Sequence, residues 1–264
     1  MQDIKISLFQ SSLYWENAEE NLASFDKKIS GLDEEPDLIV LPEMFNTGFS
    51  VEPAKVAETI KGPTFRWLQK TARTTGSVLT GSFIVQDGND FFNRLVWMQP
   101  NGFYLTYDKR HLFRMGGEHH RFTAGEKSLS VTLKGWKIRP LICYDLRFPV
   151  WSKNVFRDGV YEYDVLLYVA NWPAPRRNVW DLLLKARAIE NQAYVLGVNT
   201  VGRDGNNVEY SGGTIAINAK GETLKKANDN KEEDITTTLS YEELSNFREK
   251  FKVGMDWDRF TLSP

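Results

Sequence analysis

The alternation of hydrophobic and polar positions predicts a strand, a helix and a second strand in the first forty residues. Residues 4–9 alternate as a strand that is buried on one face, and residues 16–29 carry apolar side chains at helical spacing. Residues 37–41 are a short continuous apolar run, which is typical of a strand buried on both faces. A proline and Glu43 follow this second strand directly.

The same patterns predict further elements as far as residue 250. A helix begins at Pro63 and is closed by Gly76, and strands are expected at residues 77–85, 92–98 and 102–107. After a charged loop at residues 112–127, the order is strand 136–142, helix 147–158, strand 164–169, helix 179–192 and strand 194–200. Short strands at residues 213–218, 223–226 and 235–239 precede a last helix, which begins at Ser240. Strands that alternate with helices predict a layered α/β sandwich of helices over mixed sheets.

Composition and charge narrow the class of protein. Hydrophobic residues make up 41% of the 264 residues and nothing resembles a linker, so we expect one domain spanning residues 1–264. The formal net charge is −2 with both signs interspersed, which argues against nucleic acid as a partner. No apolar run is long enough to span a bilayer, so we expect no membrane partner. A single cysteine cannot form an intramolecular disulfide or a zinc cluster, and this favours a cytoplasmic protein.

That cysteine, Cys143, lies where a predicted strand meets a predicted helix. A thiol at the start of a helix is close to free N–H groups and to the positive end of the helix dipole. We therefore expect a lowered thiol pKa, with backbone donors available for an oxyanion. The alternative is an inert buried thiol, which is the common state of a lone cysteine.

Three predicted strands end in residues whose chemistry is complementary: Glu43, Lys109 and Cys143. Open α/β sheets carry their sites at the carboxyl ends of strands. A thiol nucleophile needs a base to take its proton and a positive group to stabilise the charge on the carbonyl oxygen. Singly, Glu43 and Lys109 also fit a solvated turn and a surface charge run, so it is their combination with Cys143 that indicates a site. The glycine pairs of the chain lack the spacing of a nucleotide-binding loop, and no cofactor is expected.

Three blocks resemble the signatures of the nitrilase, or carbon–nitrogen hydrolase, superfamily: residues 41–45 (LPEMF), 107–113 (YDKRHLF) and 143–149 (CYDLRFP). Residues 170–173 and 185–192 are similar to later blocks of the family, and the resemblance within it is greatest to bacterial omega-amidases, which hydrolyse 2-oxoglutaramate. The resemblance implies a four-layer α-β-β-α sandwich that pairs into a homodimer. It also implies a cysteine nucleophile at Cys143, a general base at Glu43, an electrostatic stabiliser at Lys109 and a second glutamate at Glu118, with no metal.

The substrate expected from this resemblance is a small molecule with a terminal amide and a carboxylate. Tyr144 would supply a backbone N–H to the oxyanion, and Arg147 and Arg176 would hold the carboxylate in a fork. Three aromatic side chains would form the pocket walls between the amide end and the carboxylate end of the substrate: Phe45, Phe113 and Trp172. The alternatives are that Arg147 pairs with Asp145 or Glu190 and that the aromatic residues are ordinary core.

Other functions remain open at this point. An N-carbamoyl amine hydrolase would use the same catalytic triad, Glu43, Lys109 and Cys143, with a different substrate pocket. A metal hydrolase would use His111, His119, His120 and Glu118, although adjacent histidines are poorly spaced for zinc. A non-catalytic binding protein would have lost the activity, and the presence of all three triad residue types argues against it. Residues 251–264 carry apolar side chains without periodicity, and we expect this tail at the dimer interface unless it folds back on its own sheet.

Overall fold

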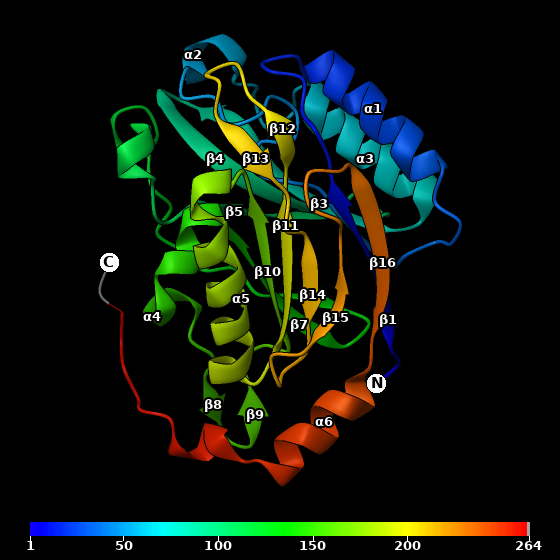
Figure 1. Cartoon of the computed structure of the whole chain (residues 1–264), viewed down its shortest axis with the longest axis vertical. Helices are drawn as coiled ribbons and strands as arrows, with labels where there is room; N and C mark the ends of the chain where they lie inside the picture. The colour runs from blue at the N-terminus through cyan, green and yellow to red at the C-terminus, as the bar shows by residue number, and fades with distance from the viewer. Residues whose placement is uncertain (263–264) are drawn as a thin grey trace.

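Two mixed sheets of six strands each lie face to face in the computed structural model, which describes residues 1–262 (Figure 1). The first sheet has the strand order β16-β1-β2-β3-β4-β5. In that order its strands are Glu233–Leu239, Ile4–Gln10, Leu38–Val40, Val78–Asp87, Asp90–Met98 and Tyr104–Asp108. Strands β1, β2 and β3 are parallel, and β5 runs the same way because β4 is antiparallel to both β3 and β5. The carboxyl ends of β2 and β5 therefore lie at one edge of this sheet.

The second sheet has the strand order β15-β14-β11-β10-β7-β6. In that order its strands are Thr223–Lys226, Ile215–Ile217, Tyr194–Asn199, Val165–Ala170, Trp136–Ile142 and Val131–Leu133. Strands β7, β10 and β11 are parallel. Strands β10 and β11 are buried along their whole length, and β7 is buried except at Lys137. Their carboxyl ends also share one edge.

Helices cover the outer face of each sheet. Helices α1 (Ala18–Ser30) and α3 (Pro63–Thr75) pack on the first sheet through a cluster that includes Phe25 and Leu68, and α5 (Arg177–Asn191) packs on β11 of the second. The predicted four-layer α-β-β-α sandwich is thus confirmed. The shorter helices are α2 (Pro53–Val56), α4 (Pro149–Ser152) and α6 (Tyr241–Lys250), with 3-10 turns η1 (Arg114–Gly116), η2 (Glu118–His120), η3 (Cys143–Arg147), η4 (Ala174–Arg176) and η5 (Val253–Asp256).

The helix predicted over residues 147–158 is wrong. The chain instead forms η3, the single turn α4 and a hairpin of β8 (Phe156–Arg157) and β9 (Val160–Tyr161). Pro149 lacks an N–H donor and starts a new helix rather than continuing one. Asp158 and Gly159 both have positive φ, 52° and 78°, which is the conformation of a two-residue hairpin turn and not of a helix end.

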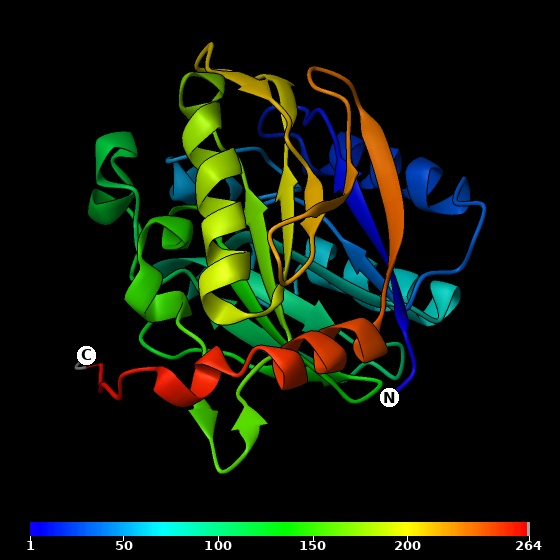
Figure 2. The same ribbon diagram turned by 60° about the horizontal axis from the view of Figure 1, so that its bottom comes forward.

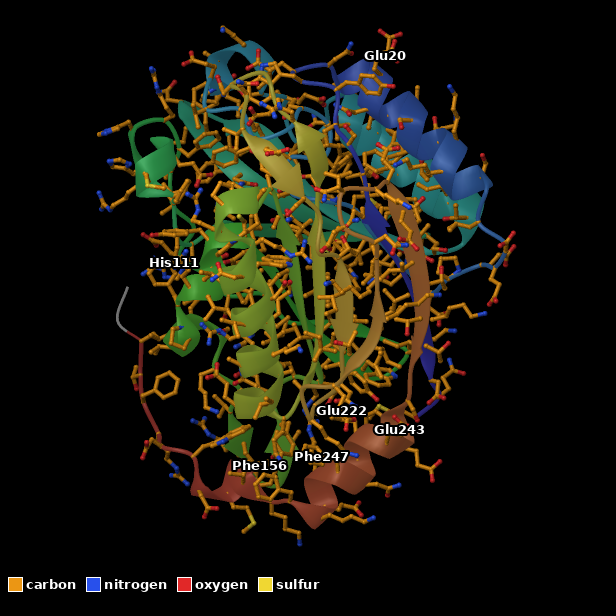
Figure 3. The ribbon with its side chains drawn as sticks, viewed as in Figure 1. Glu20, His111, Phe156, Glu222, Glu243 and Phe247 are labelled. Carbon is orange, nitrogen blue, oxygen red and sulfur yellow. The ribbon has the colours of Figure 1, made fainter. Side chains whose placement is uncertain are left out.

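The carboxyl-terminal segment crosses the end of the molecule that also carries α6 and the β8–β9 hairpin (Figure 2). Figure 3 labels Phe247 of α6 and Phe156 of the hairpin at this end. Trp257 packs against Tyr161 and lies under the amine of Lys153, 3.5 Å from its ring centre. Phe251, Met255 and Phe260 remain 57%, 67% and 45% exposed. Residues 263 and 264 of the predicted tail lie outside the described residues. Within residues 1–262, no helix combines the length and the apolar character needed to cross a membrane.

Candidate active site

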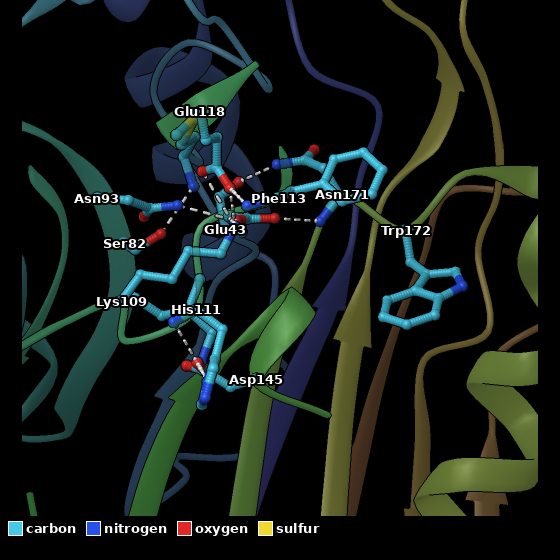
Figure 4. Close-up of polar contacts among 12 residues, drawn as sticks. Glu43, Ser82, Asn93, Lys109, His111, Phe113, Glu118, Asp145, Asn171 and Trp172 are labelled. Atoms are coloured by element: carbon cyan, nitrogen blue, oxygen red, sulfur yellow. Dashed lines mark hydrogen bonds and ion pairs between the residues drawn. The ribbon is translucent and has the colours of Figure 1, made fainter. Parts of the chain in front are cut away.

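Four strands, two from each sheet, end at one place. Glu43 follows β2 and Lys109 follows β5 in the first sheet, while Cys143 follows β7 and Asn171 follows β10 in the second. Figure 4 shows Glu43, Lys109 and Asn171 converging with Glu118 from the loop after β5. The structure therefore brings together all four residues for which a catalytic role was predicted, because Cys143 and Lys109 line the same pocket and Lys109 binds both glutamates.

The lysine is enclosed between two carboxylates. Lys109 Nζ lies 2.8 Å from Glu43 Oε1 and 2.8 Å from Glu118 Oε2, and all three side chains are fully buried. Burial alone would lower the pKa of Lys109, but the charges of Glu118 and Glu43 outweigh it and raise that pKa. Burial raises the pKa of Glu118. The charge of Lys109 partly offsets this increase, and the charge of Glu43 adds to it. The two carboxylates therefore favour the charged form of Lys109, which lines the thiol pocket.

Two asparagines fix the carboxylate of Glu43. Asn93 Nδ2 donates to Glu43 Oε1 at 2.8 Å, and the backbone N–H of Asn171 donates to Oε2 at 2.8 Å. The Asn171 side chain also donates to the Glu43 carbonyl at 2.6 Å and accepts from the Thr200 hydroxyl at 3.1 Å. Sequence reasoning assigned no role to either asparagine. Asn171 lies two positions after the predicted strand 164–169 and could have been found by that signal, whereas Asn93 lies within β4 and carries no such signal.

A sharp turn presents the thiol. Cys143 has φ +44°, a left-handed conformation that is uncommon for a residue with a side chain and marks a tight join between β7 and η3. Asp145 holds this turn because its carboxylate accepts from the N–H of Ile142 at 3.0 Å, the hydroxyl of Tyr107 at 2.7 Å and the N–H of His111 at 3.0 Å. The first amides of a helical turn lack a carbonyl partner within the turn, so those of η3, including that of Tyr144, can donate to an oxyanion.

The prediction of a lowered thiol pKa is wrong. Burial first, and then the charge of Glu43 together with a hydrogen bond to it, raise the pKa of Cys143 well above its ordinary value, although Lys109 acts in the opposite direction. The expected helix dipole is also weak, because η3 is a 3-10 turn of only five residues. The raised pKa favours the protonated thiol, so an adjacent base must take its proton during attack.

A pocket of about 270 Å³ opens onto Cys143 and contains most of the predicted binding residues. The residues that line it as predicted are Phe113, Tyr144, Arg147, Trp172 and Arg176. The predicted role of Phe45 as a wall is wrong. Its side chain is fully buried between the first sheet and α1, where it packs edge-on against Phe25 and Phe83. Walls that sequence reasoning did not find come from Phe49, Val51 and Met115 and from a hairpin formed by β12 (Val201–Arg203) and β13 (Glu209–Ser211).

The two pocket arginines lie over aromatic rings. The guanidinium of Arg147 is 5.2 Å from the ring centre of Trp172, and that of Arg176 is 5.2 Å from the ring centre of Phe113. The carboxylates considered as alternative partners of Arg147 are engaged elsewhere, since Asp145 binds His111 and Glu190 pairs with Arg187 at 2.9 Å. Across residues 1–262, neither pocket arginine forms an ion pair within 4.0 Å. Both charges are therefore available to an anion in the pocket.

The donors considered for zinc do not converge. His111 Nδ1 lies 2.8 Å from Asp145, Glu118 binds Lys109, and the rings of His119 and His120 lie against each other with centres 3.7 Å apart. In the part of the chain that the structure describes, no group of three or more His, Cys, Asp or Glu side chains is arranged to hold a metal ion.

Comparisons with known proteins give matches over nearly the whole chain. Residues 5–249 match the family model described as carbon-nitrogen hydrolase. The chain is 44% identical to omega-amidase YafV of Escherichia coli K12, covering 99% of this chain and 100% of that protein, and 32% identical to the 2-oxoglutaramate amidase of Bacillus subtilis 168, covering 95% and 96%. A carbon-nitrogen hydrolase superfamily protein of Xanthomonas campestris, solved with an arsenic adduct in its active site, superposes with a TM-score of 0.97 at 42% identity over 100% of both chains.

Proposed function

The chain belongs to the carbon-nitrogen hydrolase family, and from this premise we propose that it is an omega-amidase. It hydrolyses the terminal amide of a small carboxylate-bearing substrate, 2-oxoglutaramate first, to the free acid and ammonia. The observation that carries the substrate class is the pair of arginines, Arg147 and Arg176, that line the thiol pocket without a carboxylate partner among the described residues. An anion bound by them would set the distance between its carboxylate and the scissile carbon.

Acylation begins from a neutral thiol. Cys143 Sγ attacks the amide carbon while Glu43 takes the thiol proton, and the carbonyl becomes an oxyanion that Lys109 and the N–H of Tyr144 stabilise. The carbon–nitrogen bond then breaks, Glu43 delivers the proton to the departing nitrogen, and ammonia leaves. A thioester between the acyl group and Cys143 remains.

Deacylation uses the same carboxylate. Glu43 takes a proton from a water molecule as its oxygen attacks the thioester carbon, and the carbon–sulfur bond breaks to release the acid. Glu43 returns the proton to the sulfur, which restores the resting enzyme. The three hydrogen bonds that Glu43 accepts from Asn93, Asn171 and Lys109 hold it in one orientation through both steps. Glu118 keeps Lys109 charged and directed at the reacting centre.

Neutral amides are expected to be poor substrates. Butyramide should show a kcat/KM lower than that of glutaramate or 2-oxoglutaramate by a factor of about 10², equivalent to roughly 3 kcal/mol for an unmet charge-assisted bond. Arg176→Ala should lose most of this preference, because it removes half of the proposed fork. The measurement is steady-state ammonia release across the substrate series. Arg121→Ala is the matched control, since that arginine is exposed and has only a distant contact with Glu52 at 3.9 Å.

Two results would contradict the substrate assignment. Equal turnover of neutral and anionic amides would exclude recognition of a carboxylate. A preference for N-carbamoyl amines would favour the carbamylase alternative and leave the roles proposed for Glu43, Lys109 and Cys143 unaffected.

We also propose a cytoplasmic homodimer in which residues 251–264 contribute to the interface. Support comes from Phe251, Met255 and Phe260, which expose apolar surface although Trp257 of the same segment is packed. Sedimentation at micromolar concentration is expected to give twice the monomer mass of 30.4 kDa. A chain that ends at residue 250 should shift towards monomer. A full-length monomer would contradict the dimer, and a truncated dimer would remove the tail from the interface.

A further inference from the structure

The β12–β13 hairpin belongs to neither six-stranded sheet, yet it forms one wall of the thiol pocket. It is attached to the chain after β1, where Ser12 and Val201 form an isolated bridge and the N–H of Val201 donates to the Ser11 carbonyl at 3.1 Å. Asp204, Asn206, Val208 and Tyr210 of the hairpin line the pocket. The loop that carries Phe49 and Val51 lines it as well. The distance between these two walls depends on the side chain that packs against both of them.

Trp15 occupies the space behind both walls. A β-carbon placed on Gly48 would lie 3.3 Å from the Trp15 ring, and one placed on Gly205 at the hairpin tip would lie 2.4 Å from the indole atoms Cδ1 and Nε1. The ring is thus in direct contact with the backbone of each wall. The position of Trp15 is itself fixed, because the next residue donates its N–H to the Thr47 carbonyl at 2.8 Å.

Hydrogen bonds to the carboxylate of Asp204 link the residues of the hairpin tip to one another. Asp204 Oδ1 accepts from the N–H groups of Asn206 and Val208, both at 2.9 Å, and its Oδ2 accepts from the hydroxyl of Tyr210 at 2.9 Å. A displacement of Gly205 must therefore carry the pocket-lining side chains of Val208 and Tyr210 with it, since the carboxylate links them.

We infer that Trp15 is a positioning residue that sets the width of the acyl pocket and, through it, the chain length of the amides that the enzyme accepts. The inference rests on the proposed function only in that this pocket receives the acyl group. Trp15 is not among the residues that line the pocket with Lys109 and Cys143, and it acts through the distance between two walls.

Gly205→Ala tests this directly. Gly205 does not have a left-handed backbone, so a methyl group is opposed there by the indole ring and not by conformation. The displaced hairpin should change the ratio of kcat/KM for adipamate to that for succinamate by about tenfold, through KM, while kcat for succinamate stays within about twofold. In a Trp15→Ala background the added methyl has room, and the same substitution should leave the ratio unchanged.

Gly31→Ala is the matched control, because a β-carbon there meets only backbone oxygens at 3.4 and 3.6 Å, far from the pocket. Thermal unfolding of each variant shows that the fold is kept. A ratio that responds to Gly205→Ala equally with and without Trp15 would overturn the inference, and so would a ratio that never changes. A wild-type enzyme that lacks any preference for anionic amides, but whose chain-length ratio shifts as expected, would instead overturn the proposed substrate and leave the role of Trp15 standing.

Discussion

Cys143→Ser is expected to reduce amide hydrolysis by a factor on the order of 10⁴ or more while the fold is retained. A serine hydroxyl has a much higher pKa than a thiol, and a lone carboxylate such as Glu43 activates it poorly. The hydroxyl fits the same buried site, so thermal stability and substrate affinity should change little. Ammonia release gives the rate, and calorimetric titration with 2-oxoglutaramate gives the affinity.

Mass spectrometry of the protein quenched during turnover supplies the control for this result. Wild-type protein should carry an acyl group on Cys143 whose mass identifies the substrate, and the serine variant should accumulate none on the same timescale. A serine variant that turns over at the wild-type rate would remove the cysteine from the mechanism.

Glu43→Gln is expected to lower kcat by about 10³ and at the same time to make the thiol more acidic. The charge of Glu43 raises the pKa of Cys143, so its removal lowers that pKa. In the wild type, alkylation by iodoacetamide should still be accelerating at pH values where an ordinary thiol is already ionised, because burial and the charge of Glu43 raise the pKa of Cys143. In the variant the pH profile of alkylation should shift to lower pH. Unfolding would also expose the thiol and lower its pKa, because burial is the first cause that raises it. Thermal unfolding of the variant must therefore show a retained fold before the shift is assigned to the lost charge.

The comparison variant for this experiment is Glu118→Gln. Glu118 also raises the thiol pKa, but as the weakest of the causes acting on it, and it contacts the reacting groups only through Lys109. We expect a smaller loss of kcat and a smaller shift of the alkylation profile. An inactive Glu43→Gln enzyme with an unshifted or raised thiol pKa would contradict the proposed contact between carboxylate and thiol.

Hydrophobic patterning predicted most helices and strands because each depends on local periodicity. It could not predict which strands pair. Strand β1 lies between β2 and β16, and Ile4 of β1 pairs with Leu239 of β16, which is remote from it in the chain. The rule that chemistry lies at strand ends identified Glu43, Lys109 and Cys143, since parallel strands bring those ends to a common edge. It missed Asn93, which lies within a strand.

Each error has a physical cause. Phe45 was expected in the pocket, but the turn at Met44, with φ +43°, directs it into the core. The dipeptide Asp158-Gly159 is compatible with both a helix end and a hairpin, and only the pairing of β8 with β9 decides between them. The pKa of Cys143 depends on burial and on a carboxylate a hundred positions earlier in the chain, neither of which a strand-to-helix pattern reveals.

The division of the site between two sheets has a consequence for refolding. Glu43 and Lys109 are carried by one sheet and Cys143 and Asn171 by the other, so neither half of the molecule contains a working set of groups. Recovery of turnover after dilution from denaturant therefore reports the docking of the two sheets, and it should lag behind the recovery of secondary structure seen by far-ultraviolet circular dichroism whenever an undocked intermediate accumulates. The amount of thioester formed during refolding would then measure the fraction of molecules in which the two sheets have docked.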